Sequence, residues 1–141
     1  KMLEQTIEDG TALDKLAEFI EAQGGDPKAV YDTDLLPKAE YIEEIASPGE
    51  GYVNKIVCDE IGICSLILGG GRETKESDID LSVGLVIKKK VGDYVKKGEP
   101  LAIIHGNDKE KMKVAVSRFI SAYSFSDKPV ENQPFIKGII R

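Results

Sequence analysis

The chain has 141 residues, of which 41% are hydrophobic and 31% are charged, and its formal net charge is −6 at pH 7. This composition is typical of a globular domain with its own core and excludes an intrinsically disordered chain. No apolar run reaches the roughly 18 residues of a membrane-spanning helix, and the first residues lack a signal peptide's apolar stretch. We therefore expect a cytoplasmic protein that binds no membrane.

The first 40 residues predict an amphipathic helix followed by a shorter one. Thr11-Ala12-Leu13-Asp14 has the spacing of a capping box, and apolar residues then follow at i, i+3, i+4 and i+7 from Leu13 to Ile20. Gly24-Gly25 should end this helix, and Asp26-Pro27 should start the next, before Pro37 breaks the chain. Because Lys1 lies in what resembles the end of a helix, we expect a piece of a longer protein.

Strands and helices alternate in the rest of the chain. Extended stretches are predicted at residues 41–45, 52–57, 81–87, 94–95, 101–105 and 135–140. A helix is predicted over 112–123, and a short helix over 59–67, where a strand is the alternative. Turns at Gly92-Asp93 and Lys97-Gly98 favour a run of tight hairpins. The predicted fold class is α+β, with a long amphipathic helix.

Few residues offer catalytic or metal-binding chemistry. Cys58 and Cys64 match neither a C-x-x-C nor a zinc spacing, and both are predicted to be reduced, buried thiols. His105 is the sole histidine, which leaves little from which to build a zinc site or a histidine-activated nucleophile. We predict no catalytic, cofactor-binding or metal-binding residue.

The glycines Gly69-Gly70-Gly71 have a functional and a structural interpretation. Phosphate-binding glycine loops precede a helix, whereas these follow an apolar, helical segment, and Thr74 stands where G-x-G-x-x-G needs its third glycine. Helix termination is therefore favoured, with Gly71 as the residue of positive φ. Next to them, Arg72, Lys75, Asp78 and Asp80 predict a structural ion-pair network rather than an acid/base pair.

Basic residues concentrate in residues 88–118, which carry 9 Lys+Arg against 4 Asp+Glu. A basic stripe can follow a nucleic-acid backbone, but no aromatic side chain lies between Tyr94 and Phe119 to stack bases. We therefore interpret Lys88-Lys89-Lys90 as a solvated face and expect no nucleic-acid partner.

Residues 92–101, from Gly92-Asp93 to Leu101, are similar to the G-D-x-V-x-x-G-x-x-L hairpin of biotinyl and lipoyl carrier domains. A carrier presents its modified lysine on the turn after the last strand, and that turn here is Gly106-Asn107-Asp108. Lys109 is adjacent, without the Met-Lys-Met or Asp-Lys-Ala context. A carrier or binding module is kept as the alternative function.

Four segments together resemble the C-terminal domain of the pyrimidine-nucleoside phosphorylase and thymidine phosphorylase family. They are Ala22–Pro27; Gly51-Tyr52-Val53 with Glu60-Ile61-Gly62; Leu68–Arg72 with Lys75, Ile79-Asp80 and Val83-Gly84; and Lys90–Asp93 through Leu101. The resemblance implies an α/β hammerhead with barrel-sandwich-hybrid-like hairpins over residues 25–141, preceded at residues 1–24 by the end of a larger α/β domain.

The same resemblance implies a homodimeric parent glycosyltransferase of nucleoside salvage. That enzyme would use phosphate to cleave thymidine or uridine into the free base and the pentose 1-phosphate. The resemblance implies no cofactor for this reaction. The family's Lys-Ser-Thr-Gly-Gly phosphate loop and its pyrimidine-binding Arg and Lys match no position here. The fragment alone is therefore predicted to be inactive, with the rest of the parent chain as its partner.

Overall fold

A computed structural model describes residues 1–72, 74–130, 134 and 136–140. The chain divides into two compact units, Lys1–Pro37 and Lys38–Arg141, and each is described by itself.

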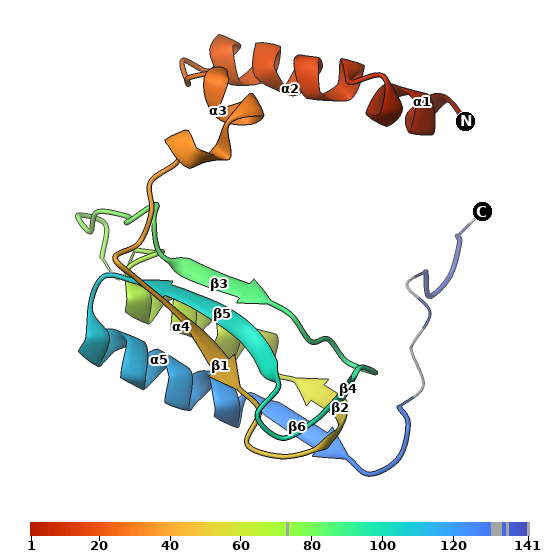
Figure 1. Cartoon of the computed structure of the whole chain (residues 1–141), viewed down its shortest axis with the longest axis vertical. Helices are drawn as coiled ribbons and strands as arrows, with labels where there is room; N and C mark the ends of the chain where they lie inside the picture. Colours follow the sequence, from red (N-terminus) through yellow and green to blue (C-terminus); the bar gives the residue numbers. More distant parts are fainter. Residues whose placement is uncertain (73, 131–133, 135, 141) are drawn as a thin grey trace. The chain divides into compact units, whose positions relative to one another are not determined.

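The N-terminal unit is helical. It contains α1 (Met2–Glu8), α2 (Thr11–Ala22), α3 (Lys28–Tyr31) and the short 3-10 helix η1 (Thr33–Leu35) (Figure 1). The predicted helix is confirmed as α2, but the capping box is wrong: Gly10, with φ 81°, is the N-cap, so Thr11 is already helical. The Thr11 amide donates instead to Asp9 Oδ1 at 3.0 Å. The short helix α3 is confirmed, since Asp26 Oδ1 accepts from the Lys28 amide at 3.0 Å.

In its described residues, the second unit combines two helices with two antiparallel sheets. Its elements are β1 (Tyr41–Ala46), β2 (Gly51–Ile56), α4 (Cys58–Leu68), β3 (Gly84–Ile87), β4 (Tyr94–Val95), β5 (Pro100–Gly106), α5 (Lys109–Ser121) and β6 (Tyr123–Ser126). One sheet has the order β1-β5-β3 and the other has the order β4-β2-β6. The α+β class is confirmed, and α4 settles the helix-or-strand alternative in favour of the helix.

The prediction of a run of tight hairpins is wrong. The turns at Gly92 and Gly98 exist, but β3 pairs with β5 while β4 pairs with β2. The reason is the burial of β5, in which Leu101, Ala102 and Ile104 are fully buried. Such a strand is stabilised by neighbours on both sides, and β1 and β3 supply them.

Three strand and helix ends also differ from prediction. The strand expected from residue 81 begins at Gly84. The helix expected over 112–123 is α5, which runs from Lys109 to Ser121, because Tyr123 belongs to β6, a strand that was not predicted. For the strand expected over 135–140, Phe135 lies outside the described residues, and residues 136–140 have no regular structure.

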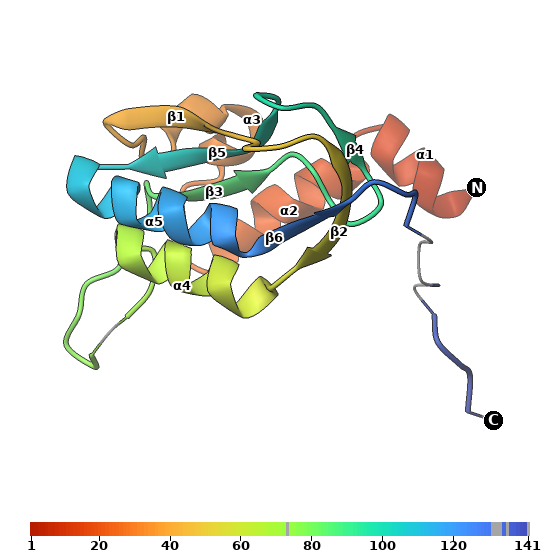
Figure 2. The ribbon, with the colours of Figure 1, turned by 90° about the horizontal axis from the view of Figure 1, so that it is seen from below.

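Helices α4 and α5 lie side by side against one face of the β1-β5-β3 sheet (Figure 2). The core between these layers includes Phe119 and Ala115 of α5, Cys64 of α4, and Ile104 of β5. Residues Ala102, Ile104 and Gly106 alternate along β5, so the period-two rule places them on one face. This core gives the unit a rigid framework for the loops at the ends of its strands.

Candidate functional site

The loop after α4 holds the glycines that the sequence singled out. Gly69 has φ 103° and ends the helix, while the Gly69 and Gly70 amides donate to the carbonyls of Leu66 and Ser65 at 3.0 and 2.9 Å. Helix termination is thus confirmed, but the choice of Gly71 as the left-handed residue is wrong. Because the two amides already donate within the helix end, neither is available to bind a phosphate.

A hydrogen-bonded group of four residues, called here the Asn107 cluster, lies beside this loop. Asp80 Oδ1 accepts from the amide and hydroxyl of Ser82 at 2.9 and 2.6 Å, and Asp80 Oδ2 accepts from Asn107 Nδ2 at 2.7 Å. Asn107 Oδ1 in turn accepts from the Glu40 amide at 2.7 Å. The cluster therefore connects three segments: the residue before β1, the loop before β3, and the β5–α5 turn.

The electrostatics of Asp80 do not suit catalysis. Hydrogen bonds from the Ser82 hydroxyl, the Ser82 amide and Asn107 lower the pKa of the Asp80 carboxyl. A carboxyl that is ionised at neutral pH and already accepts three hydrogen bonds makes a poor proton donor. The expected structural role of Asp80 agrees with this, although its partners are Ser82 and Asn107. Within the described part of the chain, no ion pair joins it to Arg72 or Lys75.

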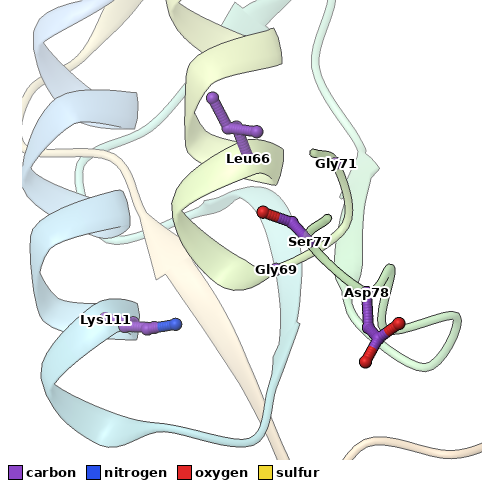
Figure 3. A pocket seen from close by; sticks show the side chains of 6 residues that line it. All are labelled: Leu66, Gly69, Gly71, Ser77, Asp78 and Lys111. Atoms are coloured by element: carbon purple, nitrogen blue, oxygen red, sulfur yellow. The ribbon is translucent and has the colours of Figure 1, made fainter. Parts of the chain in front are cut away.

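A small pocket opens between α4, the glycine loop and α5 (Figure 3). Its volume is about 150 Å³, and its lining residues are Leu66, Gly69, Gly71, Ser77, Asp78 and Lys111. Lys111 extends from α5 toward the loop, and Asp78 lies on the other side (Figure 3). Sites for cofactors and drug-sized ligands usually measure about 300–1,000 Å³, so this pocket is too small to enclose a nucleoside.

The carrier-like segment at residues 92–101 performs structural tasks. The Lys90 amide donates to Asp93 Oδ2 at 2.7 Å, and the Lys96 amide donates to Glu99 Oε2 at 2.9 Å. Lys89 Nζ lies 2.6 Å from Glu99 Oε1, and hydrogen bonds from Lys89 and from the Lys96 amide lower the pKa of Glu99. Lys89 is therefore ion-paired and mostly buried, which corrects its assignment to a solvated face.

Lys109 does not occupy a carrier position. It is the first residue of α5, whose N-cap is Asp108, and its ammonium lies 4.6 Å from the centre of the Tyr41 ring. A modified lysine must reach into solvent from an exposed turn. Lys109 instead begins a helix and contacts an aromatic ring.

The two cysteines differ in burial. Cys64 is buried as predicted, with its Sγ 3.4 Å from the Ala115 carbonyl, and burial raises the pKa of its thiol. Cys58 is exposed, so its prediction as a core thiol is wrong: it begins α4 beyond the end of β2. Among the described residues, no three His, Cys, Asp or Glu side chains come together as metal ligands.

The sequence analysis did not predict the Asn107 cluster, although the sequence carries a signal for part of it. Asp80 and Ser82 have the i, i+2 spacing of an Asx-turn, which is a local signal. Asn107 lies 27 residues beyond Asp80 and 67 beyond Glu40, and no local pattern connects residues so far apart.

In the described part of the chain, no helix is both long and apolar enough to span a membrane.

Comparison with known proteins identifies the family of the second unit. The family model described as "Pyrimidine nucleoside phosphorylase C-terminal domain" matches residues 52–126, which run from β2 to the end of β6.

Curated relatives give the same result. Pyrimidine-nucleoside phosphorylase of Geobacillus stearothermophilus is 53% identical over 106 residues, which cover 75% of this chain and 24% of that protein. The protein of the same name from Bacillus subtilis (strain 168) is 47% identical over 74% of this chain and 24% of its own length. That from Staphylococcus aureus (strain MW2) is 41% identical over 99% of this chain and 32% of its own length. The chain thus spans about a quarter to a third of these relatives, and it belongs to the pyrimidine nucleoside phosphorylase C-terminal domain family.

Proposed function

We propose that this chain acts as a non-catalytic C-terminal domain of an enzyme that cleaves thymidine or uridine with phosphate. The products would be the free base and the pentose 1-phosphate. The observation that carries the proposal is the family match over residues 52–126, which includes both helices and most strands of the second unit. The carrier alternative has no support, because Lys109 starts a helix.

Phosphorolysis demands more positioned groups than the pocket beside Lys111 supplies. Phosphorolysis must hold a dianion against the sugar and stabilise negative charge on the departing pyrimidine. Alignment alone can contribute roughly 7–11 kcal/mol to such a step, and it requires several positioned cations and N–H donors. The pocket beside Lys111 has one lysine and a volume of about 150 Å³. We assign no catalytic, cofactor-binding or metal-binding residue to this chain, and we propose that it needs no cofactor.

We also propose the finer architecture that the family resemblance implies, an α/β hammerhead with a barrel-sandwich core. Its support is that β1 and β2 belong to different sheets although a short turn joins them. In addition, β3, β4 and β5 alternate between the two sheets. This exchange of successive strands between two sheets supports the proposed barrel-sandwich core.

For the domain boundaries, we propose that residues 1–24 are the end of the preceding α/β domain and that residues 25–141 form the C-terminal domain. Gly24, with φ 82°, follows α2 and supports a boundary near this point. We further propose that the partner of this chain is the rest of a homodimeric parent phosphorylase, which acts in the cytoplasm in nucleoside salvage. No nucleic-acid or membrane partner is proposed.

The test compares this chain alone with a full-length chimera. In the chimera, the chain replaces the matching segment of the Staphylococcus aureus (strain MW2) relative, because that match covers 99% of this chain. Release of uracil or thymine from the nucleoside is followed by absorbance with and without phosphate. We expect phosphate-dependent release by the chimera and none by the isolated chain. A folded chimera without activity would contradict the proposed parent function, and activity in the isolated chain would contradict the non-catalytic role.

A further inference from the structure

The N-terminal unit lacks a core of its own. Within residues 1–37, all of which the structure describes, Ala17 is the only buried residue. These residues include no cysteine that could form a disulfide. Folded units below about 40 residues usually need a disulfide, a metal or a partner surface to be stable. The unit therefore requires apolar contacts beyond those that it makes internally.

Its unsatisfied apolar surface lies on α1 and α2. Ala12, Leu16 and Phe19 follow at i, i+4 and i+7, so they share one side of α2, and Leu16 and Phe19 are 47% and 61% exposed. A cavity of about 400 Å³ is lined by Ile7, Gly10, Ala12, Leu13 and Leu16. We call Ile7, Ala12, Leu13, Leu16 and Phe19 the α1–α2 face.

The opposite side of α2 is polar and makes its own contacts. Lys15 and Glu18 form an exposed ion pair there, three residues apart. The Tyr31 hydroxyl donates to Asp14 Oδ1 at 2.8 Å and holds the region of α3 against α2. The helix is thus amphipathic with its polar side solvated, whereas Leu16 and Phe19 on its apolar side remain 47% and 61% exposed.

Size and connectivity decide which partner fits the α1–α2 face. Five partly exposed side chains supply less than the roughly 800 Å² per partner that a stable dimer usually buries. A segment of the same polypeptide pays no translational and rotational cost of association, so a smaller apolar contact suffices. The matched family is a C-terminal domain and the relatives are three to four times longer than their matched segments, so most of their length precedes it.

We propose that the α1–α2 face is a docking surface for an apolar surface of the parent phosphorylase polypeptide that precedes the matched segment. The inference rests on the proposed function, since it takes the parent chain as the occupant. It adds the side chains through which the preceding region is held.

The experiment uses two double variants that leave the net charge unchanged. Leu16→Lys with Phe19→Glu places charges on the α1–α2 face, and Lys15→Glu with Glu18→Lys reverses the ion pair on the opposite side. Each is made in the isolated 1–141 chain and in the full-length chimera with the Staphylococcus aureus (strain MW2) relative. Thermal melting, phosphorolysis and sedimentation are measured for all forms.

We expect the face variant to lower the melting temperature of the chimera by at least about 5 °C relative to the ion-pair variant. In the isolated chain, the same two variants should melt together, because the face is exposed there. Equal melting temperatures of the two chimera variants would overturn the docking proposal. It would also be overturned if the face variant lowered the melting temperature of the isolated chain by as much as it lowers that of the chimera. A dimer of the isolated chain that the face variant dissociates would overturn it in favour of a second copy. Phosphorolysis by the wild-type chimera tests the proposed function separately, because melting does not depend on activity.

Discussion

A methyl group added at Gly106 tests the close packing between β5 and α5. A Cβ built on Gly106 would lie 2.5 Å from Met112 Cγ and 2.8 Å from Met112 Sδ, and Met112 is 2% exposed. The φ of Gly106 is not positive, so alanine is allowed by the backbone and the effect is steric. Overpacking of this kind typically costs about 1–3 kcal/mol. We expect Gly106→Ala to lower the free energy of unfolding by that amount.

A double-mutant cycle with Met112 separates this clash from other causes. Met112→Ala alone should cost about 2–5 kcal/mol because it leaves a cavity. In Gly106→Ala/Met112→Ala the new methyl enters the vacated space, so the double variant should be more stable than additivity predicts by about 1 kcal/mol or more. Urea unfolding followed by circular dichroism measures each variant. Gly62→Ala is the matched control, since Gly62 lies within α4 with no atom near its Cβ position, and it should be neutral or stabilising. Additive costs at Gly106 and Met112 would refute the steric argument.

Three further predictions concern the polar and turn residues. Gly69→Ala should destabilise the chain more than Gly62→Ala does, because Gly69 has φ 103°, and the difference is measured by urea unfolding. Burial raises the pKa of Tyr123 to about 12. The free energy of unfolding should therefore fall between about pH 10 and 12, because the phenol ionises in the unfolded chain before it ionises in the folded one. The Tyr123→Phe variant should lack this decrease, which urea unfolding at several pH values measures. Asn107→Ala should speed hydrogen exchange at the Glu40 amide, which NMR detects; unchanged exchange would mean that this hydrogen bond contributes no protection.

Local patterns predicted the two long helices because their apolar residues repeat at helical spacing. In α5, Met112, Ala115 and Phe119 are the buried residues, and they follow at i, i+3 and i+7. The same reasoning extended the helix to Tyr123, because Tyr123 continues the apolar spacing. In the structure Tyr123 is also buried. The chain instead enters β6 after Ala122, where pairing with β2 satisfies its backbone. Periodicity cannot distinguish a buried residue of the next strand from another turn of helix.

Strand pairing was beyond the reach of local patterns. The short loops between β3, β4 and β5 favoured hairpins, because neighbouring strands usually pair. The observed partners are instead set by burial: Val95 of β4 and Val53 of β2 are both fully buried and lie in the same core cluster. The pairing of β2 with β4 places Tyr52 opposite Tyr94, which are 42 positions apart in the sequence. An alternative with β4 beside β5 would have the same local turn residues.

The Asn107 cluster fixes the position at which the chain enters the second unit. Ala39 is buried, and the Glu40 amide donates to Asn107 Oδ1, so the chain is fixed in place as it enters the second unit. Glu40 is followed at once by β1, which pairs along its whole length with β5, the central strand of the sheet. Displacement of this entry point would therefore have to break the hydrogen bonds of the cluster or deform a sheet whose core is closely packed. Under the proposed non-catalytic role, a fixed entry into the second unit is a contribution to positioning that requires no catalytic side chain.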